Sequence, residues 1–366
     1  MIRIDEIYQT VFFPYFASNS KNRNFELAVH DPFGSSDPDS IVVYINGNEN
    51  RGNYLYLFDQ EPIQPNLHKS TFSKIKEYCG TKKFAMVTSE RDSENANWAQ
   101  EYLGGEQFYY FFHGWAALDW FRGFNRTFNI TPPADRTIKK TFISPNRIIG
   151  GKRKHRVAML YHMLKNDLWH NHISAPQVCP VEGEDILDIA GSMSKNYPDI
   201  VHVLKEADLP RTFRNEETQE MSSYKLTQIK ESCESLFYHV TETVATGKRH
   251  HITEKTFKPI ALQMPFILTA PAYSLAYLKQ YGFMTFGSIW DESYDFIEDD
   301  FERYTAIGKL MKQLDSYTSA EKHKLWLDCL PIIKYNYEHF YKGNFEKLLW
   351  QELENMLGQI NDYFSN

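Results

Sequence analysis

Basic side chains are concentrated around a pair of glycines in the middle of the chain. No acidic residue lies between Asp135 and Asp167, and Gly150 and Gly151 directly precede a stretch with apolar residues at helical spacing. The basic run comprises Arg136, Lys139, Lys140, Arg147, Lys152, Arg153, Lys154, His155 and Arg156. A glycine-bearing loop that enters a helix offers backbone N–H groups and a favourable dipole to an anion. The run therefore predicts phosphate binding, with a solvated basic loop as the alternative.

A Glu-Lys pair opens a second predicted helix. Glu254 and Lys255 lie in the segment HITEKTFKPIALQMPFIL, residues 251–268, after a loop that contains glycine and histidine. A carboxylate at this place can accept hydrogen bonds from ribose or sugar hydroxyls. The ammonium and the helix N-terminus can neutralise a diphosphate leaving group. The pair fits a nucleotide sugar, whereas surface decoration is the alternative for an isolated Glu-Lys pair.

Further polar residues follow predicted strands. Glu242 follows the strand in SLFYHVTET, and Asp59 and Glu61 follow the strand in YLYLFDQEP. Residues beyond the carboxyl ends of parallel strands border the ligand crevice of an α/β sheet. Asp59 and Glu61 are therefore candidate general bases, and His113, after the aromatic strand FYYFF, is a third. For each of them, a purely structural loop residue is the alternative.

Other catalytic signatures are missing from the sequence. The chain has no GxGxxG, no GxxxxGK[ST], no GxSxG and no HExxH. Asp37-Pro38-Asp39 matches the DxD pattern of metal-dependent sugar transferases, but it lies in a turn-like segment, SSDPDS. The four cysteines are scattered without a CxxC. We therefore expect no bound metal, no zinc site and no disulfide framework.

The overall composition is that of a globular protein. The 366 residues are 42% hydrophobic and 24% charged, which suggests about two domains. Aromatic residues reach 15%, which suits either core packing or stacking of sugars and bases. The net charge of -7 disfavours a protein that coats nucleic acid but allows a local basic patch. No signal-like segment or stretch long enough to span a bilayer is present, so we expect a cytoplasmic protein without a membrane span.

Strand-like and helix-like stretches alternate twice along the chain. Predicted strands are 41–46, 54–58, 84–88, 108–112, 140–144, 200–204, 235–240 and 265–269. Predicted helices are 70–79, 93–103, 154–166, 223–232, 254–263 and 273–281, with a helical tail in 318–364. The alternation predicts an α/β fold with two Rossmann-like domains facing a central cleft. The proline pair at 132–133 suggests these boundaries: an N-terminal domain 1–137, a C-terminal domain 138–335 and a helical tail 336–366.

The order of these motifs resembles a known family. FISPNRIIGGKRKHRVAML, SLFYHVTET, ITEK and MPFILTAP follow one another within residues 140–290. This order is similar to that of the two-domain GT-B glycosyltransferases, closest to the α1,3-fucosyltransferase type and its viral and bacterial relatives. The resemblance implies that Arg156, Glu242, Glu254 and Lys255 hold a nucleotide sugar. His251 stands where the family often has a tyrosine, and LFDQEP matches the family's glutamate-proline segment only loosely.

The sequence as a whole leads to the expectation of a glycosyltransferase. We expect an inverting, metal-independent transfer from a UDP- or GDP-linked sugar, with no further cofactor. FFHGWAALDWF, residues 111–121, also resembles phage-encoded glycosyltransferases. The first expected acceptor is therefore a 5-hydroxymethyl pyrimidine in phage DNA, as in glucosyl- or arabinosyl-type DNA modification in the host cytoplasm, with the basic stretch 136–156 as a DNA contact. A surface glycan or lipid-linked sugar is the alternative acceptor, and a non-catalytic sugar- or nucleotide-binding module is the alternative function.

Overall fold

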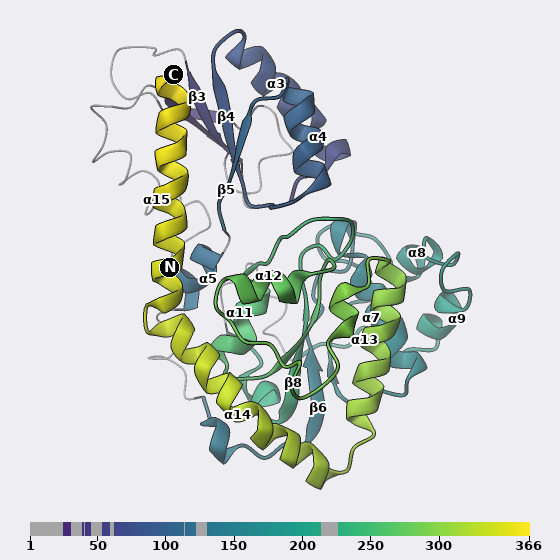
Figure 1. The fold of residues 1–366 in the computed structure, drawn as a ribbon. Coiled ribbons are helices and arrows are strands. Elements are labelled where there is room, and N and C mark those ends of the chain that lie inside the picture. The colour runs from purple at the N-terminus through teal and green to yellow at the C-terminus, as the bar shows by residue number, and fades with distance from the viewer. Residues whose placement is uncertain are drawn as a thin grey trace. The chain divides into compact units, whose positions relative to one another are not determined.

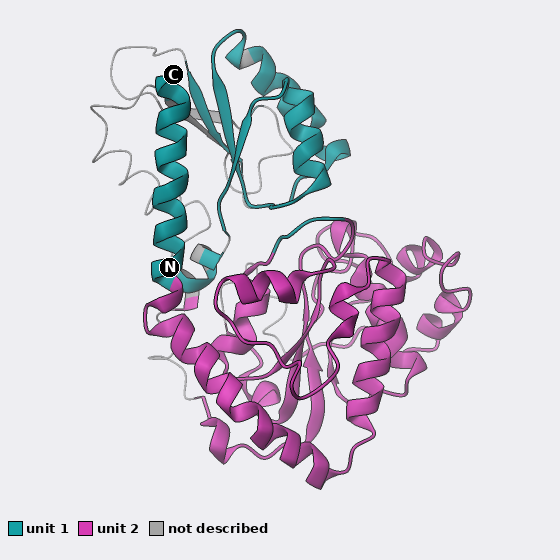
Figure 2. Cartoon of the chain, viewed as in Figure 1, with its two compact units in different colours: residues 1–119, 248–251, 346–366 teal, residues 120–247, 252–345 magenta. Residues whose placement is uncertain are grey.

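The computed structural model describes residues 25–30, 39, 41–44, 53–58, 62–112, 114–121, 130–213 and 226–366. The chain divides into two compact units (Figure 2). Unit 1 comprises residues 1–119, 248–251 and 346–366, and unit 2 comprises residues 120–247 and 252–345. Each unit contains a sheet with parallel strands and helices packed on it, which confirms the predicted α/β class with Rossmann-like character.

The described strands of unit 1 form one sheet with the order β2-β1-β3-β4-β5. The strands are β1 (Glu26–His30), β2 (Ile41–Tyr44), β3 (Tyr54–Leu57), β4 (Phe84–Thr88) and β5 (Gln107–Tyr110). Only the pairing of β1 with β2 is antiparallel. Helices α3 (Pro65–Cys79) and α4 (Glu94–Leu103) lie on one side of the sheet, and α15 (Asn344–Ser365) lies on the other (Figure 1). The short helix α5 (Gly114–Phe121) spans the boundary with unit 2.

Unit 2 contains a parallel sheet with the order β7-β6-β8-β9 among its described residues. Its strands are β6 (Lys140–Ser144), β7 (His172–Ile173), β8 (Ser235–Thr241) and β9 (Phe266–Thr269). Its helices are α7 (His155–Lys165), α8 (Ile186–Gly191), α9 (Ile200–Lys205), α10 (Ile229–Cys233), α11 (Glu254–Ala261), α12 (Ser274–Gln280), α13 (Asp300–Asp315) and α14 (Ser319–Tyr341), with short 3-10 turns η4 (Pro133–Asp135), η5 (Gly151–Arg153) and η8 (Ser293–Phe296). Every residue of β8 and β9 is buried, as expected for parallel strands covered on both faces. Among the described helices, none is both long and apolar enough to cross a membrane.

One predicted strand is wrong. Residues 200–204 belong to helix α9 rather than to a strand. A short apolar run cannot be assigned by periodicity alone, and here the tertiary contacts decide. Ile200 and Leu204, four residues apart, are both buried, while Asp199 accepts hydrogen bonds from Tyr161 and Lys165 of α7. The remaining predicted strands coincide with β2, β3, β4, β5, β6, β8 and β9 to within two residues at each end, and β1 and β7 had not been predicted.

The boundary between the units lies earlier than predicted. The first segment of unit 1 ends at Asp119, whereas the sequence suggested a boundary at residue 137. The segment around the proline pair belongs to unit 2 because Arg136 is buried there and donates to the carbonyl oxygens of Leu262 (2.8 Å) and Gln263 (2.9 Å) at the end of α11. Trp326 of α14 also donates its indole N–H to the carbonyl oxygen of Pro133, at 3.0 Å. These long-range contacts join the proline-containing segment to the helices α11 and α14 of unit 2.

The predicted helical tail is not a separate part. The helix α14 belongs to unit 2, and nearly all of α15 belongs to unit 1. The ring of Phe364 packs on that of Phe25, with 4.7 Å between the centroids. The hydroxyl of Tyr363 donates to the carbonyl oxygen of Phe84 in β4, at 3.0 Å. The end of the chain thus completes the first unit, because the apolar side of α15 finds its partners there.

We predict that Arg136→Met lowers the free energy of unfolding by about 2–4 kcal/mol, because buried carbonyl groups lose charge-assisted hydrogen bonds. Chemical denaturation monitored by circular dichroism measures this loss. Lys139→Ala is the control: its exposed ammonium pairs with Glu234, and such surface pairs contribute at most about 1 kcal/mol. Equal, small effects of both substitutions would contradict the structural role of Arg136.

Candidate functional site

The candidate site lies at the carboxyl ends of the strands in unit 2. In the sheet, β7 lies next to β6 on one side, whereas β8 and then β9 follow on the other side of β6. The order of the strands therefore reverses between β6 and β8. In open α/β sheets, ligands bind in the crevice that such a reversal creates at the carboxyl ends. Three segments meet this edge: the loop after β6, the loop after β8 and the start of α11.

Glu242 is fully buried and caps the start of α11. Its carboxylate accepts hydrogen bonds from the backbone N–H of Thr253 (3.0 Å), the hydroxyl of Thr253 (2.5 Å) and the hydroxyl of Thr256 (2.6 Å). The backbone N–H of Thr243 adds a longer fourth contact of 3.2 Å. Both carboxylate oxygens are thus engaged within the protein. Glu242 holds the beginning of α11 in place, and a ligand could reach its oxygens only by replacing these donors.

Lys255 lies at the first turn of α11, where Glu242 fixes the backbone. Its ammonium donates to the hydroxyl of Thr243 (2.9 Å) and to the carboxylate of Glu254 (2.7 Å), and it makes a longer contact with the hydroxyl of Thr253. The Lys255 side chain is 24% exposed, whereas the side chain of Glu254 is 4% exposed. Lys255 therefore presents a positive charge at the surface of the site, and the buried carboxylate of Glu254 pairs with its ammonium.

Arg156 is buried beneath the same edge. Its guanidinium donates to the carbonyl oxygen of Ile148 (2.8 Å) and to that of Thr241 (2.9 Å), so it joins the loop after β6 to the end of β8. Its Nε has no hydrogen-bond partner among the described residues. Burial, followed by the nearby Arg153, lowers the pKa of Arg156 to about 9. The predicted donor-binding residue Arg156 is thus placed at the site, but as a brace between two loops.

Arg147 stands apart from the other predicted donor-binding residues. It lies in the loop that follows β6 and is half-buried. Within the described part of the chain, no hydrogen bond or ion pair engages its guanidinium. The next residue, Ile148, is the one that Arg156 fixes to β8. The backbone of Arg147 thus lies in the loop that follows β6, at the predicted edge.

The glycine loop, Gly150 to Lys154, already holds the chain's own carboxylates. The backbone N–H of Gly151 donates to Glu184 at 2.7 Å, and the ammonium of Lys154 pairs with the same side chain at 2.7 Å. Arg153 lies 3.8 Å from the carboxylate of Glu182. The loop is therefore paired with the chain's own glutamates, and its binding of a phosphate stays a prediction. The two glutamates flank Gly183 in the segment PVEGED, and the sequence analysis missed them.

A buried polar network links the strand ends below the site. The two ring nitrogens of His239 in β8 form hydrogen bonds with the hydroxyls of Ser144 in β6 and Thr269 in β9, both at 2.9 Å. Asn146 accepts a 3.2 Å hydrogen bond from Thr241. Complete burial lowers the pKa of His239 to about 3, so the imidazole is neutral at physiological pH. The network fixes three neighbouring strands at the edge where the loops begin.

In unit 1, the carboxyl end of β4 carries a buried ion pair that the sequence analysis missed. Glu90, whose side chain is fully buried, accepts from the guanidinium of Arg249 at 3.0 Å and from the backbone N–H of Ile63 at 2.9 Å. Burial raises the pKa of Glu90. Arg249 lies in the segment 248–251, which belongs to unit 1, and residues 91 and 250 form an antiparallel bridge. The predicted bases Asp59, Glu61 and His113 lie outside the described residues.

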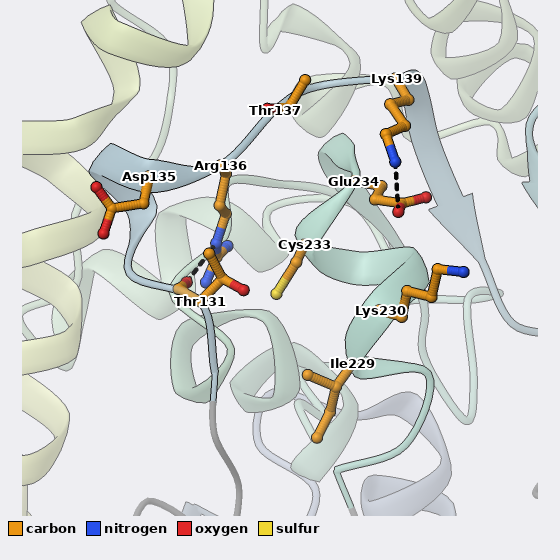
Figure 3. A pocket seen from close by; sticks show the side chains of 9 residues that line it. All are labelled: Thr131, Asp135, Arg136, Thr137, Lys139, Ile229, Lys230, Cys233 and Glu234. Carbon is orange, nitrogen blue, oxygen red and sulfur yellow. Dashed lines mark hydrogen bonds and ion pairs between the residues drawn. The ribbon is translucent and has the colours of Figure 1, made fainter.

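A separate pocket of about 540 Å³ lies at the opposite end of the unit 2 sheet. It is lined by Thr131, Asp135, Arg136, Thr137, Lys139, Ile229, Lys230, Cys233 and Glu234 (Figure 3). Figure 3 shows Arg136 turned toward Thr131 and Lys139 joined to Glu234. The pocket lies at the amino ends of the strands, so it does not coincide with the candidate site at their carboxyl ends. Both of these cations also have partners within the protein.

We also searched for a metal-binding cluster among the described residues and for similar proteins, and neither search found one. The described residues contain no group of three or more histidine, cysteine, aspartate or glutamate side chains placed to hold a metal ion. No protein-family model, curated protein or solved structure matches the chain.

We predict that stability falls as the pH drops below 6.5, because unfolding lets His239 bind a proton that the native state excludes. The depressed pKa of His239 places this window between about 6.5 and about 3. His239→Gln should reduce the slope of the unfolding free energy against pH by about 1.4 kcal/mol per pH unit in this window. Urea titrations at several pH values measure the slope.

Proposed function

We propose that this protein is a glycosyltransferase that moves a sugar from a nucleoside-diphosphate sugar to an acceptor hydroxyl. The proposal rests on one observation. Arg147 and Lys255 both lie in segments at the carboxyl ends of β6 and β8, where the strand order of the unit 2 sheet reverses. Arg147 follows β6, and no hydrogen bond or ion pair with another described residue engages its guanidinium. Lys255 has a partly exposed ammonium beyond β8, at the start of α11. Both cations lie at the edge where α/β sheets bind nucleotides.

A diphosphate suits this pair of cations. A guanidinium can bind two phosphate oxygens in parallel, while the ammonium contributes a compact charge. Lys255 lies on the first turn of α11, where the helix dipole favours an anion. As the bond from the anomeric carbon to the phosphate oxygen breaks, these groups would stabilise the charge that develops on the leaving diphosphate. The proposal therefore needs no metal to neutralise the leaving group.

The transfer also needs a group that takes the proton from the acceptor. In a single displacement, the acceptor oxygen forms its bond to the anomeric carbon as the diphosphate departs, and the configuration is inverted. Glu61, with Asp59 and His113 as alternatives, is the proposed base for the acceptor proton. The GT-B organisation of the two units stays a prediction from the sequence, as does the cytoplasmic location.

The acceptor stays a choice between DNA and a glycan. A DNA acceptor would draw on the basic stretch 136–156, but most of its charges are engaged within the protein. Arg136 and Arg156 are buried, and Lys139, Arg153 and Lys154 pair with carboxylates. The stretch is thus not a continuous basic surface that could follow a phosphate backbone. This observation favours a surface glycan or a lipid-linked sugar as the acceptor over phage DNA.

We expect Lys255→Ala and Arg147→Ala each to weaken the binding of a nucleoside diphosphate about 10- to 150-fold, the range for one lost charge-assisted hydrogen bond. Calorimetric titration of the full chain with UDP and with GDP measures the affinities. Lys312→Ala, an exposed lysine on α13, serves as the matched control and should bind as the wild type does. Unchanged affinity in both test variants would refute the phosphate assignment.

Glu61→Gln should lower the turnover about 10²- to 10⁴-fold, because a general base typically contributes that much. The affinity for the nucleoside diphosphate should stay near that of the wild type. Release of UDP or GDP from a panel of nucleotide sugars, with water as the acceptor, measures the turnover. A loss in Asp59→Asn alone would move the base to Asp59. Binding without turnover in the wild type, for every sugar and acceptor tried, would favour a non-catalytic binding module.

A further inference from the structure

Two aromatic rings are exposed together beyond the end of β9. Tyr273 is 38% exposed and Phe296, in the turn η8, is 61% exposed. Their ring centroids lie 5.8 Å apart at an interplanar angle of 72°. In this edge-to-face arrangement one ring supports the other and leaves aromatic faces open to solvent. Both rings lie in unit 2, and neither takes part in the site described above.

The backbone around this pair is held in a specific conformation. Tyr273 has a φ of 65°, in the left-handed region that residues other than glycine rarely adopt. Its N–H donates to the carbonyl oxygen of Asp295 at 2.6 Å, and its hydroxyl donates to Glu298 at 3.1 Å. The buried carboxylate of Asp295 accepts from the backbone N–H groups of Leu275 and Ala276 at the start of α12. These contacts fix Tyr273 beside the turn that carries Phe296.

A buried arginine joins the aromatic pair to the candidate site. Arg303 donates to the carbonyl oxygens of Ala245 after β8 (2.7 Å), Ala270 after β9 (3.0 Å) and Ile297 next to Phe296 (2.7 Å). Only one residue, Val244, separates Ala245 from Thr243, whose hydroxyl accepts a hydrogen bond from the ammonium of Lys255. Neighbouring strands lie about 4.8 Å apart, so the ends of β6, β8 and β9 span roughly 10 Å. A nucleotide whose diphosphate contacts Lys255 can therefore extend along this edge toward the rings.

We propose that Tyr273 and Phe296 form the subsite that stacks against the base of the nucleotide. The inference rests on the proposed function, because it takes the diphosphate to be bound at Lys255. A base has a flat aromatic face, and stacking on an aromatic side chain contributes about 1–3 kcal/mol per base. Inorganic pyrophosphate has no base and requires only the cations. The two ligands therefore test the two halves of the site separately.

The test is a calorimetric titration of the full chain with UDP, GDP and inorganic pyrophosphate. Phe296→Ala should weaken the binding of at least one of the two nucleotides about 5- to 150-fold, which corresponds to the stacking range, and leave the affinity for pyrophosphate unchanged. Tyr273→Asn, which tolerates the left-handed backbone, should act in the same direction. Tyr335→Ala is the matched control, since it removes a comparably exposed tyrosine on α14. Thermal unfolding followed by circular dichroism verifies that each variant is folded.

Phe296→Leu and Phe296→Tyr separate stacking from a general apolar contact. Stacking requires the leucine variant to lose nucleotide affinity and the tyrosine variant to keep it. Full affinity of the leucine variant would overturn the stacking subsite. If the Phe296 variants bind nucleotides normally while Lys255→Ala weakens both nucleotides and pyrophosphate, the subsite is wrong and the proposed function stands. If wild-type protein binds none of the three ligands, the proposed function fails and the subsite with it.

Discussion

The carboxylate of Glu242 is the buried charge on which the candidate site depends. Removal of a carboxylate from water costs several kcal/mol unless donors replace the water. Here the replacement comes from the first turn of α11, where Thr253 and Thr256 donate to both oxygens. The helix must therefore begin at this point against the end of β8. The position of Lys255 follows from this constraint, because it is the second residue of that helix.

Two buried arginines extend the same principle to the loops. Arg156 holds the loop after β6 against the end of β8, and Arg303 holds the loops after β8 and β9 against the turn next to Phe296. Each guanidinium supplies several donors in a fixed plane, so one side chain can satisfy carbonyl groups from separate segments. The loops at the strand ends are thus braced from below. Such bracing holds in place the loops and turns that carry Arg147, Lys255 and the aromatic pair.

Charge compensation also determines which cations remain accessible. The glycine loop attracts Glu182 and Glu184, so Arg153 and Lys154 are partly neutralised within the protein. Arg147, only a few residues earlier, has no such partner in the described structure. The accessible positive charge at this edge is therefore narrow rather than spread along the whole run. A narrow charge suits a small anion such as a diphosphate better than the long backbone of a nucleic acid.

The sequence by itself determined the local elements and the residue types at the strand ends. Buried runs such as 84–88 and 235–240 form strands, and Thr253 caps the helix that carries Lys255, because these preferences depend on near neighbours. The tertiary structure decided the long-range partners. Residues 200–204 form a helix rather than a strand, and nearly all of α15 packs in unit 1. The carboxylate of Glu184 accepts a hydrogen bond from the backbone N–H of Gly151, 33 residues away in the sequence. In the structure, the guanidinium groups of Arg136 and Arg156, predicted as phosphate ligands, donate to backbone carbonyl oxygens and connect separate segments. The sequence does not show which carbonyl or carboxylate groups folding brings next to a charged side chain.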